Sequence, residues 1–185
     1  MTLQQVKEYE SQQKEIWQKR HWVEQLSQYG ITEKNFNDYQ TKLSQEFGTK
    51  ASVNDTVWRI LNVKILQTDN YHELKTIYWH MAEVLRSEGK NPNHILEQVT
   101  RLSLLEFQKS GATSVTISTA NDTYVCDSCK KLEGKVITIE QALKTMPIPH
   151  ACTNHSGCRC EYLPIFSSKN ARKEKKRRKK KFGLF

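Results

Sequence analysis

Cysteine is absent from the first 125 residues of this 185-residue sequence, and all five cysteines lie between positions 126 and 160. Cysteines used only for core packing would not be confined to one short window. Two close pairs separated by a loop are typical of a tetrahedral metal site, because each pair supplies two thiolates from one tight turn. The candidate metal ligands are Cys126, Cys129, Cys152, Cys158 and Cys160.

Two further absences bear on where the protein works. No stretch approaches the roughly 20 apolar residues of a membrane span, and the N-terminus lacks the apolar run and cleavage site of a signal peptide. These absences predict a cytoplasmic location. Thiols stay reduced in the cytoplasm, and five cysteines cannot all pair within one chain. Zn²⁺ is therefore the expected occupant, since thiolates and imidazole suit it and it needs no redox partner.

The folded part of the chain has no excess of either charge. Residues 169–181 hold ten of the 29 basic residues and one of the 20 acidic ones, so residues 1–168 hold nineteen of each. The whole net charge of +9 therefore lies in the C-terminal segment. A block of like charges repels itself, stays disordered and attracts phosphates through counterion release. The predicted nucleic-acid-binding residues are Lys173, Lys175, Lys176, Arg177, Arg178, Lys179, Lys180 and Lys181.

Residues 1–110 show helical periodicity. Phe36, Tyr39, Leu43 and Phe47 recur at three- and four-residue steps before Gly48, which is a typical pattern of one helix face and its end. Two later helix starts resemble capping boxes, Ser52 with Asp55 and Asn70 with Glu73, and Asn91-Pro92 opens a further helix with Pro at its first position. Five helices with short links predict a bundle-like region.

Residues 111–166 change to the alternation of β-strands. The three predicted strands are 113–119, 135–139 and 158–166, with a short helix at 140–144 between the second and third. A three-stranded sheet of this size buries too little apolar area to be stable alone. A metal ion, or packing against the helix that ends near Gly111, would supply the missing stability. The predicted class is thus α+β, with domains at 1–110 (helical), 111–166 (zinc-binding β module) and 167–185 (disordered basic tail).

The cysteine-rich part resembles a known family. Cys126-x-x-Cys129, Gly134-Lys135 and His155-Ser-Gly-Cys158-Arg-Cys160 are similar to the C-terminal segment of phage head-morphogenesis proteins, the Mu-F-like minor head family. The resemblance covers about residues 100–163. It implies a structural metal module in a protein that acts in or on a capsid, often linked to DNA packaging or ejection. Two features depart from the family pattern: an extra Cys152 in Pro-His-Ala-Cys, and Ser-Gly where Pro is usual after His155.

The sequence leaves the four ligands open among the five cysteines and His155. In a strict strand Cys158 and Cys160 point to opposite sides, so they are not expected to share one ion. The favoured set is Cys126, Cys129, Cys152 and Cys160.

The predicted function is that of a non-enzymatic, DNA-associated structural or adaptor protein of phage or prophage type. A bacterial zinc module that binds nucleic acid or a protein partner, in housekeeping or defence, is the alternative. A metal-dependent nuclease ranks third, because Asp122 precedes the cysteines without an accompanying histidine. A protein partner is expected at the helical region or at Phe182–Phe185, where two phenylalanines and a leucine end the chain.

Overall fold

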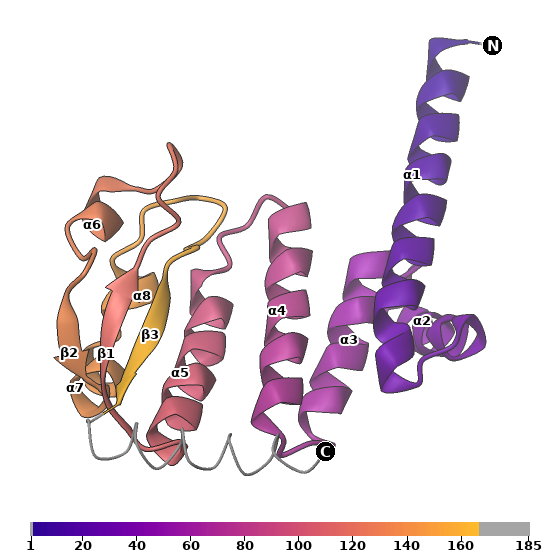
Figure 1. The fold of residues 1–185 in the computed structure, drawn as a ribbon. Helices are drawn as coiled ribbons and strands as arrows, with labels where there is room; N and C mark the ends of the chain where they lie inside the picture. Colours follow the sequence, from indigo (N-terminus) through magenta and orange to yellow (C-terminus); the bar gives the residue numbers. More distant parts are fainter. Residues whose placement is uncertain (1, 167–185) are drawn as a thin grey trace, which may run out of the picture. The chain divides into compact units, whose positions relative to one another are not determined.

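The computed structural model describes residues 2–166, and over this range the chain is α+β, as the sequence predicts (Figure 1). The long helices come first and an antiparallel three-stranded sheet follows. The chain divides into two compact units, Met1–Thr68 and Asp69–Phe185. The last two long helices therefore belong to the same unit as the sheet, whereas the sequence-based division at residue 110 follows the change of secondary structure.

The first unit contains three α-helices. These are α1 (Leu3–Leu26), followed by a 3-10 turn (Ser27–Tyr29), then α2 (Glu33–Phe47) and α3 (Val53–Ile65). Each α-helix begins with a reciprocal capping box, with Thr2, Thr32 and Ser52 as the N-cap residues. Such caps satisfy the backbone N–H groups that have no partner inside the first turn. The sequence pattern at Ser52 and Asp55 thus predicts the start of α3 correctly.

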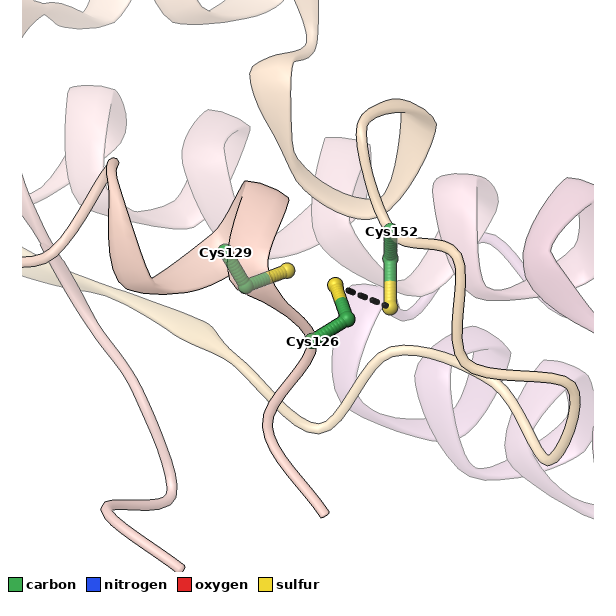
Figure 2. A group of neighbouring side chains, drawn as sticks. All are labelled: Cys126, Cys129 and Cys152. Carbon is green, nitrogen blue, oxygen red and sulfur yellow. Dashed lines mark hydrogen bonds between the residues drawn. The ribbon is translucent and has the colours of Figure 1, made fainter. Parts of the chain in front are cut away.

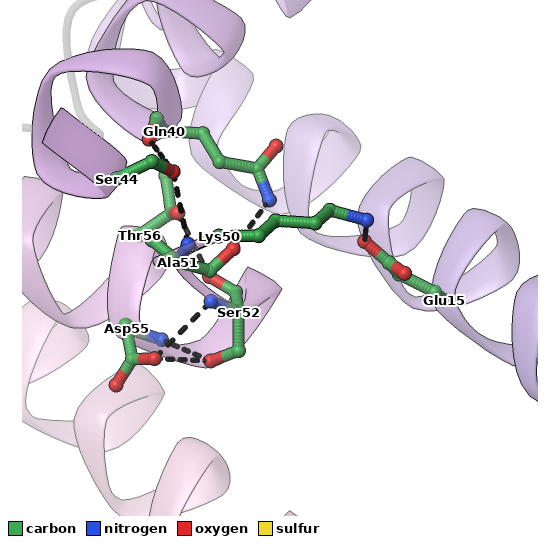
Figure 3. A network of polar contacts seen from close by, with 8 residues as sticks. All are labelled: Glu15, Gln40, Ser44, Lys50, Ala51, Ser52, Asp55 and Thr56. Atoms are coloured by element: carbon green, nitrogen blue, oxygen red, sulfur yellow. Dashed lines mark hydrogen bonds and ion pairs between the residues drawn. The ribbon is translucent and has the colours of Figure 1, made fainter. Parts of the chain in front are cut away.

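Hydrogen bonds around Ala51 connect α2 to the start of α3 (Figure 3). The Ser52 hydroxyl accepts the Asp55 N–H at 3.0 Å, and the Asp55 carboxylate accepts the Ser52 N–H at 3.2 Å. On the other side, the Ala51 N–H donates to Ser44 Oγ and the Ala51 carbonyl accepts from Gln40 Nε2, both at 2.9 Å. The connection is therefore held by polar contacts to both helices.

Burial in this unit is concentrated in α2, α3 and the end of α1. Phe36 and Ile60 are fully buried, and α1 contributes Trp22 and Leu26 to the buried set. The first half of α1 extends past α2 and α3 (Figure 1), and its Leu3 and Tyr9 are exposed. Apolar burial and helix capping account for the stability of this unit.

The second unit begins with two helices that lie side by side, α4 (Tyr71–Ser87) and α5 (Asn93–Lys109) (Figure 1). The Asn70 side chain accepts the N–H groups of His72 and Glu73, so the predicted cap at Asn70 is confirmed. Helix α5 begins one residue later than predicted, with Pro92 as its N-cap.

The sheet has the strand order β2-β1-β3, with both pairs antiparallel. Its strands are β1 (Ala112–Ser118), β2 (Val136–Thr138) and β3 (Glu161–Phe166), and short helices connect them: α6 (Asp127–Lys130), α7 (Ile139–Thr145) and α8 (Pro147–His150). Val115 of the central strand pairs with Ile137 of β2 and with Pro164 of β3. The three predicted strands are confirmed, except that β3 begins at Glu161 and not at Cys158.

One face of the sheet is buried against α5 and the connecting helices. Val115, Ile117 and Ile137 form one buried cluster with Leu104 of α5. Cys129, Cys152 and Cys158 belong to the same cluster. The sheet therefore has the helix support that its small size requires, and the cysteines continue its core.

The predicted basic tail, residues 167–185, with its nucleic-acid-binding residues and Phe182–Phe185, lies outside the described residues. Among the helices described here, none has both the length and the apolar character needed to cross a membrane.

Candidate metal centre

Three separate segments of the second unit bring the five cysteines together. Cys126 is the N-cap residue of α6 and Cys129 lies in its single turn. Cys152 follows α8, and Cys158 and Cys160 precede β3. All five are free thiols. The sequence separation between the segments is large, so their meeting is a property of the tertiary fold.

The local structure of the first pair follows from its spacing. The N–H of Lys130 donates to the Cys126 carbonyl at 3.0 Å, and the N–H of Leu132 donates to the Cys129 carbonyl at 2.9 Å. These bonds close two successive turns, so both side chains of the Cys-x-x-Cys point to the same side (Figure 2). Such a turn presents two thiolates to one ion.

The Sγ atoms form two triads that share Cys129. The thiols of Cys126, Cys129 and Cys152 lie within 4.8 Å of one another (Figure 2), and so do those of Cys129, Cys158 and Cys160. Two pairs are separated by 3.9 Å, Cys126 with Cys152 and Cys129 with Cys158. In a tetrahedral site with Zn–S bonds of about 2.3 Å, neighbouring sulfurs are about 3.8 Å apart. A disulfide requires about 2.05 Å. The cluster thus fits a metal site.

The electrostatics of the thiols differ across the cluster. Burial opposes ionisation of Cys126, but hydrogen bonds from Thr153 and Cys129 outweigh it and lower its pKa to about 6. The Thr153 N–H lies 3.4 Å from Cys126 Sγ. Burial and the neighbouring thiols raise the pKa of Cys129 and of Cys158 well above the usual range. Several thiolates this close repel one another, and a bound cation removes that repulsion.

Asn93, at the start of α5, holds two of the cysteine segments together. Its Nδ2 donates to the Cys152 carbonyl at 3.2 Å, and its Oδ1 accepts the Cys158 N–H at 2.9 Å. Strand β3 starts at Glu161 because the residue opposite, Ser118, is the last residue of β1, and the Cys158 N–H bonds to Asn93 instead. The sequence reasoning missed Asn93; Asn91 and Pro92 marked a helix start, but no local pattern points to loops about 60 residues away.

The predicted alternation of Cys158 and Cys160 is wrong in its premise. Both residues lie outside β3, so strand geometry does not separate them, and both thiols approach Cys129. Cys158 is buried, whereas Cys160 is partly exposed.

The histidines near the cysteines make other contacts. His155 Nε2 lies 2.9 Å from the Gly89 carbonyl oxygen, and His150 Nε2 lies 2.8 Å from a Glu97 carboxylate oxygen. In residues 2–166, the groups of three or more side chains placed to hold a metal ion consist of the cysteines. The structure therefore places His155, the alternative ligand, outside the thiol cluster.

Next to the cysteines, the loop before α6 contacts the loop before β3. Arg159 pairs with Asp122 at 2.5 Å, and its guanidinium lies 5.7 Å from the centre of the Tyr124 ring. The hydrogen bond from Arg159 lowers the pKa of Asp122. A cavity of about 10 Å³ is lined by Arg159 and by four of the cysteines, Cys126, Cys129, Cys152 and Cys160. This is about the space that one water-sized species occupies. Asp122, the residue singled out for a nuclease, thus serves a salt bridge between loops.

No family model, curated protein or solved structure was found to match this chain.

Proposed function

We propose that the chain is a non-enzymatic structural or adaptor protein whose second unit contains a structural zinc site, and that its basic C-terminal segment associates with DNA. The observation that carries the zinc site is the convergence of five free thiols, in which two sulfur pairs are 3.9 Å apart. This is close to the sulfur–sulfur distance in a zinc tetrathiolate.

The donor set supports zinc over harder ions. Thiolates are soft ligands, whereas Mg²⁺ and Ca²⁺ take oxygen donors. A tetrahedral zinc in an all-thiolate site has no open position for substrate or water, which is the mark of a structural site. Three of the five thiols are buried in the sheet's own core, so the ion would stabilise the sheet directly.

The biological setting in this proposal comes from the sequence motifs. Cys126-x-x-Cys129 and His155-x-x-Cys158-Arg-Cys160 resemble the phage head-morphogenesis family, and the DNA association rests on the ten basic residues of 169–181. The competing setting is a bacterial zinc module that binds nucleic acid or a protein partner. Neighbouring genes that encode portal and capsid proteins would favour the first setting over the second.

Metal analysis of the purified protein tests the zinc site. We expect one zinc per chain; protein without metal, with its thiols intact and free, would contradict the proposal. DNA association is tested by a salt titration of binding with the full chain and with a variant ending at residue 168. Equal binding by both proteins would remove the role of the basic segment, because that segment carries the whole net charge.

A further inference from the structure

Five thiols meet at a site where a tetrahedral ion takes four, so one cysteine is surplus. Given the zinc site proposed above, we infer that the ligands are Cys126, Cys129, Cys152 and Cys158, and that Cys160 is a free thiol next to the occupied site, open to modification by soft electrophiles.

The choice of Cys158 follows from which sulfurs approach one another. In a tetrahedral site every pair of ligand sulfurs lies at about the same short distance. Cys126, Cys129 and Cys152 already meet this condition among themselves, within 4.8 Å. Cys158 Sγ lies 3.9 Å from Cys129 Sγ, the thiol that both triads share. The Cys152 thiol is also near enough to raise the pKa of Cys158.

Cys160 satisfies fewer of these conditions. In residues 2–166, its thiol forms a triad with those of Cys129 and Cys158, and only Cys129 belongs to the first triad.

One observation points the other way. Cys160, and not Cys158, lines the small cavity together with Cys126, Cys129 and Cys152. Sulfur–sulfur proximity decides the choice, because a residue lines a cavity with any of its atoms, whereas a ligand must present Sγ to the other three sulfurs. The same cavity is lined by Tyr124 and Arg159, and Cys160 is partly exposed.

Burial agrees with this assignment. Cys158 is 7% exposed, belongs to the core of the sheet, and has its backbone fixed by Asn93. Cys160 is the more exposed member of the pair and adjoins the first residue of β3. The more constrained thiol is the better ligand, because less side-chain freedom is lost when it binds.

The matched pair Cys158→Ala and Cys160→Ala tests the assignment, with zinc content and Co²⁺ absorption as readouts. We expect Cys160→Ala to keep one zinc per chain, an affinity within about twofold, and the unchanged spectrum of a cobalt tetrathiolate. Cys158→Ala removes a ligand itself. It should therefore weaken zinc binding by more than the roughly 100-fold that the loss of a hydrogen bond to a ligand can cost. The sulfur-to-cobalt absorption should also decrease.

If Cys158→Ala fails to fold, alkylation of the unsubstituted, metal-loaded chain tests the assignment instead, because it shows which thiol is free. Iodoacetamide forms an Sγ–carbon bond, iodide leaves, and the thiol proton passes to solvent. We expect peptide mapping to find Cys160 modified first, with zinc retained. Zinc loss in Cys160→Ala with retention in Cys158→Ala, first modification at another cysteine, or two metal ions per chain would overturn the assignment. Absence of metal from the unsubstituted chain would instead overturn the proposed zinc site itself.

Discussion

The two compact units differ in what stabilises them. Met1–Thr68 consists of helices that begin with capping boxes and bury residues such as Phe36 and Ile60. Asp69–Phe185 contains a small sheet whose strands are seven, three and six residues long, and every cysteine of the chain. The first unit is built from capped helices alone, whereas a sheet as short as that of the second unit depends on what packs against it. The cysteines occur only in the unit that contains this sheet.

Metal removal should produce the largest difference in stability between the two units. Under the zinc proposal, a chelator removes a binding free energy on the order of 10 kcal/mol from the folding of the second unit. Hydrogen exchange should then show loss of protection in β1, β2 and β3, while α2 and α3 keep theirs. Equal loss in both units, or no loss in either, would contradict the comparison. Readdition of Zn²⁺ is the control.

Truncation of a core side chain in the first unit should destabilise that unit and leave the second unit unchanged. Phe36 is fully buried in α2, and Phe36→Ala should destabilise the first unit by about 3–5 kcal/mol through lost burial and a cavity. Denaturant unfolding followed by hydrogen exchange measures the loss, and zinc content should stay unchanged. The exposed Leu66→Ala is the matched control, with an expected effect below about 0.5 kcal/mol. Zinc release by Phe36→Ala would show that the units depend on each other.

Two glycines in the left-handed region test how tightly each unit is packed. At Gly157 (φ +95°) an added Cβ would lie 2.7 Å from Pro92 Cγ and 2.9 Å from Leu96 Cδ1, whereas at Gly30 (φ +73°) it would meet nothing within 4 Å. Both substitutions to Ala cost about 1–2 kcal/mol of backbone strain, and overpacking adds about 1–3 kcal/mol at Gly157 alone. If thermal unfolding shows equal losses of stability for the two variants, the loop beside Cys158 moves enough to relieve the added contact.

The smallest expected effect is the loss of one helix cap. Ser52→Ala removes the side-chain acceptor for the Asp55 N–H and should cost about 1 kcal/mol, confined to the first unit. The change in unfolding midpoint measures it, and Ser52→Thr, which keeps a hydroxyl, should recover most of the loss. A loss of several kcal/mol would mean that the α2–α3 connection, and not the cap alone, depends on Ser52.

The sequence predicts local features of this protein well. Helix starts at Ser52 and Asn70 were readable because a cap involves residues two or three positions apart. Strand alternation identified all three strands for the same reason. The late start of β3 was not readable, since it depends on where β1 ends: Ser118, the last residue of β1, pairs with Glu161.

The metal centre likewise has features that the sequence predicts and features that only the structure shows. Spacing identified the five cysteines as one group and left His155 as an alternative ligand. The structure assigns His155 to the Gly89 carbonyl and brings all five thiols around Cys129. The spacing of the cysteines along the chain does not show how closely the loops that carry them approach one another.

By itself, the sequence determined where the long helices and the three strands lie to within a few residues, that the net charge is confined to residues 169–181, and that the thiols occupy one window. Each of these is set by residues near one another in the chain. Only the tertiary structure decided which helices share a unit with the sheet, that Asn93 joins two cysteine segments, and which sulfurs are neighbours. These depend on long-range packing, in which small displacements decide whether two sulfurs meet.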